Sequence, residues 1–374
     1  MEGDVSIVQP TVPHYLEAFF AGLSKLLAPC RVSLFSYIGE EASKRSGFSI
    51  GRKTIHLPNV NVGGVLLYSP TPLLKGGVGC LVLMLHFAHL TTWLLLLTKR
   101  IHHRKVILWG HGISVKRYMQ EERCLDWRLR LMVALSDGVW FYTEKELQLW
   151  RRLFPEKHMV ALGNTISNVN DALLKSSSPK DELRLKHSIR QKVVLIFCAR
   201  FENVYRRTDL LLDVIEHLDA DRYGFVIIGE GRYKPDFSKY RNVYDYGAVY
   251  DQQVKDELFG LSDIYFQPGW VGLSIVEAMA YGKPVYTFRR SGEVKQCVEY
   301  SYIIDGYNGK TFENVSDCLY ALRTIDKADI HRMSRNAIGF VRDNLTMDMM
   351  VQTAVTSIET ICAKPTKEYH LKMS

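Results

Sequence analysis

Apolar and polar residues follow two different periods along this chain. Short apolar runs, such as residues 193–198, alternate with longer stretches in which apolar residues recur at helical spacing. This alternation is typical of parallel β-sheets covered by helices, because parallel strands need a crossover connection. The pattern occurs twice, on either side of Gly163-Asn164-Thr165. The sequence therefore predicts an α/β protein with two domains.

In the first half the pattern predicts strands and helices in turn. The strands are expected near Val5–Val8, Val32–Ser36, Val78–Leu85, Val106–Trp109 and Gly138–Tyr142. The helices are expected near His14–Leu27, Ala88–Arg100, Tyr118–Leu135 and Glu144–Leu153. We take Thr143 with Glu146 as a capping box and Asp137 as a turn residue.

The second half repeats this organisation. Its strands are expected near Val193–Cys198, Tyr223–Ile228, Val243–Tyr246, Ile264–Gln267 and Val285–Phe288. Its helices are expected near Asp209–Leu218, Gln252–Leu261, Ser274–Ala280, Val315–Ile325 and Ile330–Asn344. We expect domains at residues 1–163 and 164–345, then a helix from Met347 to Ala363, within residues 346–374, that crosses back to the first domain.

Length and composition agree with this organisation. A chain of 374 residues that is 47% hydrophobic is too long for one ordinary core and suits two. The seven cysteines are odd in number and scattered, without a C-x-x-C pair, so the sequence suggests neither a disulfide framework nor a zinc site. Acidic residues near Met1 and two early prolines argue against a signal peptide, and a reducing cytoplasm fits best.

One segment approaches the length of a membrane span. Residues 80–98 read CLVLMLHFAHLTTWLLLLT. Its histidines and threonines argue against a transmembrane helix. A buried strand followed by a helix explains the same run, since central strands of such sheets are apolar on both faces.

The net charge of +8 does not by itself choose a partner. Many basic residues of the first half are interleaved with apolar residues at helical spacing. They are Lys99, Arg100, Arg104, Lys105, Lys116, Arg117, Arg123, Arg128, Arg130, Arg151 and Arg152. Two interpretations stay open, a solvated helix face and a surface that rests on anionic lipid. We find no RNA-binding aromatic motif and expect no nucleic acid.

Candidate chemistry lies in loops that follow strands of the second half, where ligands bind in open α/β sheets. Arg200 and Arg206 follow the Val193–Cys198 strand, and their planar guanidinium groups match phosphate oxygens. Gly229-Glu230-Gly231 follows the next strand and permits close backbone approach. A solvated loop and a plain turn remain the alternatives for these two segments.

The strongest signal is the segment Gln267–Val285, in which a strand leads into a glycine-containing loop and a helix. We expect Ser274 to cap that helix, and Gly282 and Pro284 to end it. Free N–H groups at the helix start, near Leu273, would bind an anion. Glu277, one turn further, could accept hydrogen bonds from ribose hydroxyls.

This segment, P-x-x-x-x-G-L-x-x-x-E-A-M-A-x-G-x-P-V, resembles the donor-site motif of the GT-B retaining glycosyltransferases, in particular glycosyltransferase family 4, whose bacterial members build cell-surface glycans. The resemblance extends to an Arg-Lys phosphate pair (Arg200, Arg206), a G-[DE]-G turn (Gly229, Gly231) and Gly247. The first half resembles its acceptor-domain loops at Gln9–Tyr15, Trp109–Gly112 and Tyr142–Glu144.

The resemblance implies two Rossmann-like domains with parallel sheets facing a central cleft. Residues 1–163 would bind the acceptor, a glycan or lipid-linked saccharide, and residues 164–345 a UDP-sugar or GDP-sugar. It implies that Arg200, Arg206 and His111 act in catalysis, and that Gly229, Gly231, Gly247, Gly269, Gly272, Leu273, Ser274 and Glu277 bind the donor. The expected enzyme is a retaining hexosyltransferase without metal or other cofactor, cytoplasmic or peripheral on the inner membrane face.

The sequence departs from the family pattern at two positions. Gly269 stands where the family commonly has a glutamate that touches the donor sugar, and Arg206 stands where lysine is usual. The donor sugar is therefore left open, and Arg206 keeps the charge with a different geometry. For other histidines, we give His14 a weaker claim to function and interpret His86 as a core or rim residue.

Alternative functions remain compatible with the same domains. A nucleotide-sugar epimerase would need acid-base side chains around its sugar and would act without an acceptor. A phosphorylase would need a lysine for pyridoxal phosphate, for which the sequence offers no convincing candidate. A non-catalytic glycan-binding protein with a decayed donor site is favoured only by Gly269.

Overall fold

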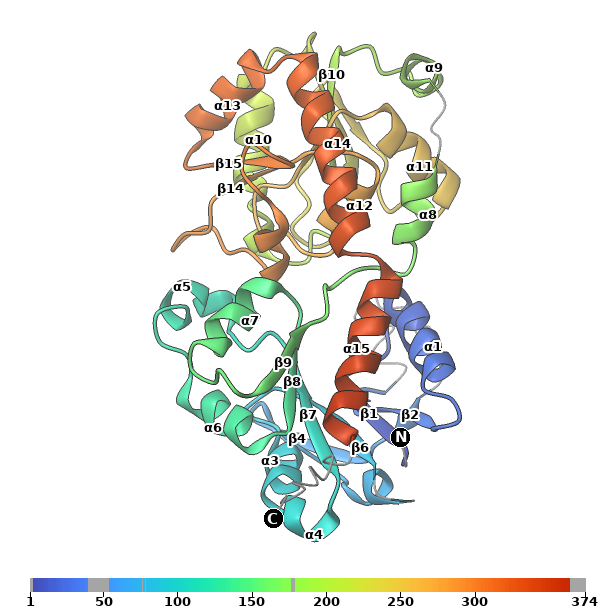
Figure 1. Ribbon diagram of the computed structural model, residues 1–374. Coiled ribbons are helices and arrows are strands. Elements are labelled where there is room, and N and C mark those ends of the chain that lie inside the picture. Colours follow the sequence, from blue (N-terminus) through green and yellow to red (C-terminus); the bar gives the residue numbers. More distant parts are fainter. Residues whose placement is uncertain (1–2, 40–53, 76, 78, 176–178, 364–374) are drawn as a thin grey trace, which may run out of the picture. The chain divides into compact units, whose positions relative to one another are not determined.

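The computed structural model describes residues 3–39, 54–75, 77, 79–175 and 179–363. The chain divides into two compact units, each built around one parallel sheet (Figure 1). Unit 1 comprises residues 1–112, 125–162 and 350–374, and unit 2 comprises residues 113–124 and 163–349. Residues 113–124, which the sequence analysis placed in the first domain, thus group with unit 2.

The sheet of unit 1 has the strand order β3-β2-β1-β6-β7-β8-β9, with every neighbouring pair parallel. Its strands are β1 (Val5–Gln9), β2 (Val32–Ser36), β3 (Ile55–His56), β6 (Cys80–Met84), β7 (Lys105–Trp109), β8 (Gly138–Phe141) and β9 (His158–Ala161). A separate antiparallel hairpin joins β4 (Asn59–Val62) to β5 (Val65–Tyr68). Its two-residue loop, Gly63-Gly64, has positive φ at both positions, as a tight hairpin turn requires.

Helices cover the sheet of unit 1. They are α1 (Glu17–Leu26), α3 (Leu90–Leu97), α4 (Lys99–His102), α6 (Trp127–Leu135), α7 (Glu144–Arg151) and most of α15 (Met347–Cys362). The side chain of Trp140 donates to Ser357 Oγ at 2.8 Å, so the last helix is bonded to the central strands. Gly22 of α1 lies so close to α15 that a Cβ there would be 2.8 Å from Val351.

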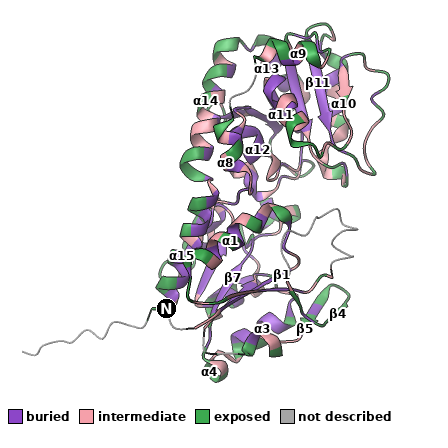
Figure 2. Ribbon diagram, turned by 90° about the vertical axis from the view of Figure 1, so that its right-hand side faces the viewer, coloured by how far each residue is buried: buried purple, intermediate pink, exposed green. Residues whose placement is uncertain are grey.

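The sheet of unit 2 has the order β12-β11-β10-β13-β14-β15, again parallel throughout. Its strands are β10 (Val193–Cys198), β11 (Tyr223–Ile228), β12 (Val243–Asp245), β13 (Ile264–Phe266), β14 (Val285–Phe288) and β15 (Gly309–Phe312). In chain order this arrangement reads 3-2-1-4-5-6, the doubly wound order of dinucleotide-binding sheets. Buried residues fill the strands, while exposed residues lie on outward helix faces (Figure 2).

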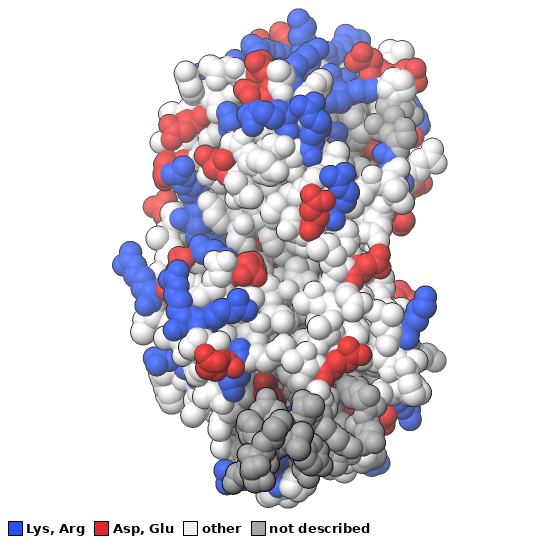
Figure 3. Space-filling model, viewed as in Figure 1, with Lys and Arg blue, Asp and Glu red and all other residues white. Residues whose placement is uncertain are grey.

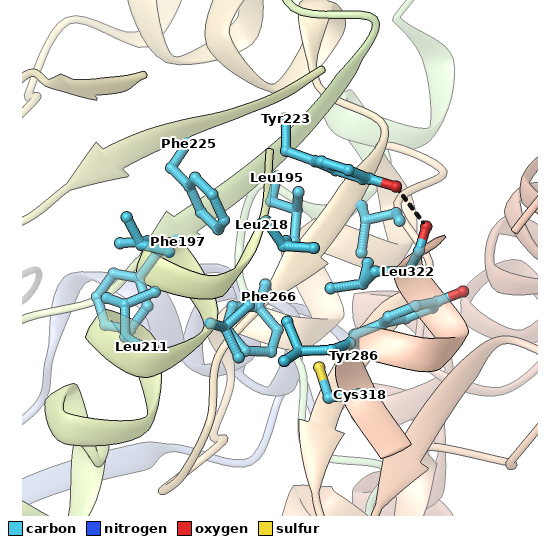
Figure 4. Close-up of a cluster of buried hydrophobic side chains, with 14 of the residues drawn as sticks. Leu195, Phe197, Leu211, Leu218, Tyr223, Phe225, Phe266, Tyr286, Cys318 and Leu322 are labelled. Carbon is cyan, nitrogen blue, oxygen red and sulfur yellow. Dashed lines mark hydrogen bonds between the residues drawn. The ribbon is translucent and has the colours of Figure 1, made fainter. Parts of the chain in front are cut away.

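The helices of unit 2 are α5 (Tyr118–Glu121), α8 (Val169–Leu174), α9 (Lys180–Lys186), α10 (Thr208–His217), α11 (Gln252–Leu261), α12 (Ser274–Ala280), α13 (Val315–Thr324) and α14 (Lys327–Asn344). Between the sheet and helices α10 and α13 lies a core of aromatic and aliphatic side chains (Figure 4). The hydroxyl group of Tyr223 donates to the Leu322 carbonyl at 2.9 Å, which pairs a buried polar group within this core.

Most expected elements are confirmed to within a few residues, and several, such as β10 and α11, have the expected bounds. One expected helix, Tyr118–Leu135, is wrong as a single element. It is broken between α5 and α6 because Asp126 begins a new helix, its carboxylate accepting from the Arg128 N–H at 2.8 Å. The hairpin, β3, β9, β15, α8 and α9 have no counterpart in the sequence prediction.

The apolar run at residues 80–98 divides as expected into a strand and a helix. β6 ends at Met84, and α3 begins at Leu90 and has 8 residues. At 1.5 Å per residue, such a helix is roughly 12 Å long, well short of a bilayer. Among the residues that the structure describes, no helix is long and apolar enough to cross a membrane.

Candidate active site

The strand order of unit 2 by itself predicts where a ligand binds. β10 pairs with β11 on one side and β13 on the other, and their crossovers run in opposite directions. At this switch point the loops diverge and leave a crevice outside the carboxyl ends of the strands. The loops that begin after Cys198 and after Phe266 therefore border the expected ligand crevice, and both carry residues predicted from the sequence.

Arg206 is fixed between these two loops. Its Nη1 donates to the carbonyl oxygen of Trp270 at 2.7 Å, and its Nε donates to that of Arg200 at 3.2 Å. The guanidinium group has five N–H donors, so these two bonds leave others for a ligand. Burial lowers the pKa of Arg206 from its usual 12.5. Arg200 is exposed, and its backbone carbonyl is the group that Arg206 contacts.

A buried network holds the loop after β13. The Tyr265 hydroxyl lies 2.6 Å from Gln267 Oε1 and 2.9 Å from Ser274 Oγ, and Gln267 Nε2 donates to the carbonyls of Gly269 and Trp270. The expected cap by Ser274 is wrong. Leu273 already has helical φ and ψ and is the N-cap, without a side-chain bond, while the Ser274 hydroxyl turns inward to Tyr265.

Glu277 lies in α12 where the motif predicts it, and it is nearly buried. Its two oxygens lie 2.7 and 2.6 Å from Lys255 Nζ, and Asn168 donates to it at 3.3 Å. Burial acts to lower the pKa of Lys255, but the charge of Glu277 and its hydrogen bond to Lys255 act in the other direction, and that pKa is raised. Burial raises the pKa of Cys198, at the end of β10, to about 12. A carboxylate has further lone pairs, so Glu277 can still accept hydrogen bonds.

Sequence reasoning missed Lys255. It lies in α11, separated from Glu277 by 22 positions, and helical periodicity cannot show which residues of two helices face each other. A lysine within a helix that precedes the motif is the only linear signal, and it is not distinctive. Packing of α11 beside the sheet creates the pair.

Gly269, the position of the missing glutamate, lies against another loop. A Cβ there would be 2.4 Å from the carbonyl oxygen of Tyr205, so no side chain fits without moving the backbone. The next residue, Trp270, has φ 53°, and its ring stacks on Tyr205 at 4.9 Å between centroids. An aromatic stack thus stands beside the position where the family has a carboxylate.

The remaining glycines separate into two kinds. A Cβ at Gly229 would lie 2.1 Å from the Ala199 carbonyl oxygen, and one at Gly231 would lie 2.6 Å from Phe201. These two glycines let the loops after β10 and β11 pack together. Gly247 has φ 62° and accepts a bond from the Gly229 N–H at 2.7 Å. By contrast, the closest atom to a Cβ at Gly272 would be 3.9 Å away, so space remains beside that residue.

His111 belongs to unit 1, whereas the other candidate residues belong to unit 2. It follows β7 and is exposed, with its ring 4.6 Å from that of Tyr142. Gly112 beside it has φ 67°, and a Cβ there would be 2.5 Å from Phe141, which explains why position 112 is a glycine. His14 and His86 are also exposed, so the core interpretation of His86 is wrong, although its place at the rim of the sheet holds.

Two other expected features have a definite outcome. The Thr143 side chain donates to Glu146 and makes no cap bond to a backbone N–H, so the expected capping bond of Thr143 does not form. Asp137 accepts from the Val106 N–H at 2.7 Å and pairs with Lys99, so its carboxylate bonds to β7 and α4, and these bonds do not close a turn. In the described part of the chain, no group of three His, Cys, Asp or Glu side chains is placed to hold a metal ion.

Comparisons with known proteins agree with this geometry. Residues 192–322 match the family model described as Glycosyl transferases group 1. No curated protein sequence matches the chain. Anabaena HepE in complex with UDP has a TM-score of 0.66 at 14% identity, covering 96% of this chain and 100% of that one. TarM has a TM-score of 0.64 at 10% identity, covering 96% and 99%.

A third similar structure is described as trehalose-6-phosphate from E. coli bound with UDP-2-fluoro glucose. Its TM-score is 0.61 at 12% identity, covering 95% of this chain and 99% of that one. At these identities the structures establish the fold alone, and the family model covers residues 192–322, less than half of the chain. The chain has the GT-B fold of these glycosyltransferase structures, and residues 192–322 are similar to the group 1 glycosyl transferases.

Proposed function

We propose that the protein transfers a sugar from a nucleotide-diphosphate sugar to a hydroxyl group of a glycan or lipid-linked saccharide, in cell-surface polysaccharide synthesis. The observation that carries this proposal is that Arg206 bonds to both loops at the switch point of unit 2, the one with Arg200 and the one that leads into the helix of Glu277. These residues supply two cations and one carboxylate next to a loop with open space at Gly272. A diphosphate and a ribose need this combination of groups.

UDP-sugars and GDP-sugars are the donors that we propose. Anabaena HepE, one of the similar structures, is in complex with UDP or UDP-glucose, which favours uridine. Glu277 would accept hydrogen bonds from the ribose hydroxyls, held in position by Lys255. The Tyr205–Trp270 stack, beside Gly269, would meet the donor sugar through an aromatic face instead of a carboxylate.

The proposed reaction breaks the bond between the anomeric carbon and the diphosphate oxygen, and forms a bond from that carbon to the acceptor oxygen. Negative charge grows on the departing diphosphate, so fixed cations lower the barrier. Arg200 and Arg206, with the N–H groups near Leu273 and Ser274, would stabilise it without a metal ion. The acceptor proton would pass to the departing phosphate oxygen, with retention at the anomeric carbon, and His111 would bond the donor sugar or the acceptor.

Thermal stabilisation by UDP, GDP, CMP and ADP, and by their sugars, tests the donor site, since a ligand at 100 times its Kd adds about 2.7 kcal/mol to the free energy of unfolding. We expect one nucleotide to raise Tm, and Arg200→Ala and Glu277→Ala to abolish the rise. Transfer activity should persist in EDTA if the reaction is metal-independent. An absent shift with every nucleotide would instead favour a non-catalytic glycan-binding protein.

An exposed surface of unit 1 supports our proposal that the protein binds peripherally to the cytoplasmic face of a membrane. Exposed apolar side chains recur on α3 and α4 at positions 90, 94, 97 and 101, one face of a helix, with Leu97 68% and Ile101 78% exposed. α3 packs against β5 and α6, and these two elements expose further apolar side chains. We call this set the apolar face: Val60, Val62, Val65, Leu67, Leu90, Leu94, Leu97, Ile101, Trp127 and Leu131.

The charges beside the apolar face favour anionic lipid. The helices α3, α4 and α6 contain no acidic residue, and they expose Arg100 and Arg130. Two other basic residues of the first half do not contribute. Arg104 is buried, and Lys99 pairs with Asp137 at 2.8 Å. Two exposed arginines beside exposed leucines fit a surface that lies at the membrane–water interface.

Vesicle flotation tests the apolar face. Burying a leucine or isoleucine side chain is worth about 1.5–3 kcal/mol, so the double variant Leu97→Ser/Ile101→Ser should bind phosphatidylserine vesicles at least tenfold more weakly. The matched control, Leu174→Ser/Leu185→Ser, changes two exposed leucines of unit 2 and should bind like the wild type. Equal binding by both variants, or none by the wild type, would exclude this surface.

A further inference from the structure

Unit 2 contains a second hollow beside the candidate donor site. It has a volume of about 310 Å³ and lies between residues 115–123 and the loop that follows β14. Its lining includes the cationic side chains of Lys116, Arg117, Arg123, Arg290 and Lys295, and none of its described lining residues is acidic. Figure 3 shows Lys and Arg side chains gathered over the region of α5, at the left of that view. We call this hollow the basic pocket.

Aromatic rings and carbonyls hold the cations of the basic pocket in place. The Arg290 guanidinium lies 3.5 Å from the centre of the Tyr118 ring, and its Nη2 donates to the Cys297 carbonyl at 2.7 Å. Lys116 Nζ lies 5.5 Å from the centre of the Tyr205 ring. Guanidinium groups stacked on aromatic faces keep their edge donors available for a ligand. The pocket therefore has a fixed arrangement of donors.

Most of this positive charge has no internal counterion. Arg117 pairs with Glu121 at 2.6 Å, and the other oxygen of Glu121 accepts from the Ser114 N–H. Among the described residues, no carboxylate forms an ion pair with Lys116, Arg123 or Lys295. Concentrated positive charge in a concave place raises the local concentration of anions.

The basic pocket is joined to the donor loop through the backbone. The carbonyl oxygen of Lys295 accepts from the Trp270 N–H at 2.8 Å, and the carbonyl oxygen of Trp270 accepts from Arg206. Tyr205, which faces Lys116, also stacks on Trp270. An occupant of the pocket would therefore lie next to the loop that we assign to the donor.

We propose that the basic pocket binds the phosphate or diphosphate group of the acceptor. This proposal rests on the proposed function, because it assumes an acceptor for sugar transfer. Five cations exceed the charge of a single carboxylate and match the two or more negative charges of a diphosphate. The volume lies at the lower end of ligand sites and suffices for a diphosphate with part of its carrier. Both a lipid diphosphate and a soluble sugar phosphate present this chemistry.

Calorimetric titration with inorganic pyrophosphate tests the pocket on four proteins. They are the wild type, the pocket variant Lys116→Ala/Arg123→Ala, the donor variant Arg200→Ala/Glu277→Ala, and the charge-matched control Lys192→Ala/Lys327→Ala. The substituted pocket residues are exposed and in no ion pair among the described residues, so folding should persist, which Tm checks. We expect the pocket variant to bind at least tenfold more weakly, and the control to bind like the wild type.

The donor variant separates the two sites. Pyrophosphate binding that survives in it and is lost in the pocket variant supports the pocket, even if no nucleotide binds and the proposed function fails. Equal binding by wild type and pocket variant overturns the pocket proposal and leaves the donor site untouched. Tighter binding of farnesyl diphosphate in detergent than of glucose 1-phosphate would assign a lipid carrier, and the reverse order a soluble acceptor.

Discussion

The two units share a strand scheme but differ at their switch points. In unit 2, the polar groups beside β10 and β13 bond to one another: Tyr265 to Gln267 and Ser274, and Lys255 to Glu277. In unit 1, the switch point lies between β1 and β6, where Gln9 Nε2 and His89 Nδ1 are buried without a hydrogen-bond partner among the described residues. Unpaired buried polar atoms are costly. The loop after β10 in unit 2 also holds such an atom, Asn203 Oδ1, so both switch points leave polar capacity to a ligand, and unit 2 differs in the bonded network beside it.

Buried charge gives the largest expected difference between the units. Lys255→Met would leave Glu277 buried and unpaired, which costs about 3–5 kcal/mol of unfolding free energy. The matched change in unit 1, Lys99→Met, removes the partner of the more exposed Asp137 and should cost under about 1 kcal/mol. Denaturant unfolding measures both. Equal losses of unfolding free energy in the two variants would contradict the expected difference between the two ion pairs.

Catalysis should depend more on Arg206 than on its neighbour. Loss of one fixed charge donor typically lowers kcat about 10²–10³-fold, so we expect this for Arg206→Ala in a transfer assay with the nucleotide sugar that binds. Arg207→Ala is the control, because the Arg207 guanidinium is bonded to Asp209 at 2.6 Å, although the stem of its side chain lies beside Gly269. Arg206→Lys should recover part of the rate. Similar losses at both arginines would contradict the assigned role.

Replacing a closely packed glycine by alanine tests the stability of each unit with the same chemical change. A Cβ at Gly79 of unit 1 would lie 2.0 Å from the Asp4 carbonyl oxygen, and one at Gly229 of unit 2 would lie 2.1 Å from that of Ala199. Each change to alanine should cost about 1–3 kcal/mol or more. Gly292→Ala, with no atom within 4 Å, should be neutral. Calorimetry should show each substitution lowering the transition of its own unit, and a single shared shift would show that the units unfold together.

The pH dependence of stability probes the interior of unit 2 further. Burial lowers the pKa of Lys283 from 10.5 to about 7 in the folded state. Between these values the unfolded state binds more protons, so the free energy of unfolding rises with pH, by at most about 1.4 kcal/mol per pH unit from this group. Below pH 7 the contribution stops changing. Lys283→Met should flatten this rise in urea unfolding between pH 7 and 9.5, and an unchanged slope would refute the shift.

The sequence was more informative for unit 2 than for unit 1. The motif around Glu277 and the strands β10, β11 and β14 were predictable, because each strand is apolar on both faces and bounded by turn residues. The β4–β5 hairpin of unit 1 was missed, although β4 alternates asparagine with valine and Gly63-Gly64 follows it; β4 is exposed on both faces, and β5 has no polar residue. The Ser274 cap failed because a tertiary partner, Tyr265, competes for the hydroxyl.

By itself, the sequence determined the two α/β halves, the donor-site motif and the strand-end loop that carries Arg200 and Arg206, since periodicity and strand-end loops are local properties of the chain. Only the tertiary structure decided that Lys255 pairs with Glu277 and that the Tyr205 carbonyl leaves no room for a side chain at Gly269. It alone also decided that residues 113–124 group with unit 2 and line the basic pocket. These features depend on which surfaces of distant segments meet. Packing fixes such contacts through the shape of the whole unit, and no local pattern of apolar and polar residues encodes them.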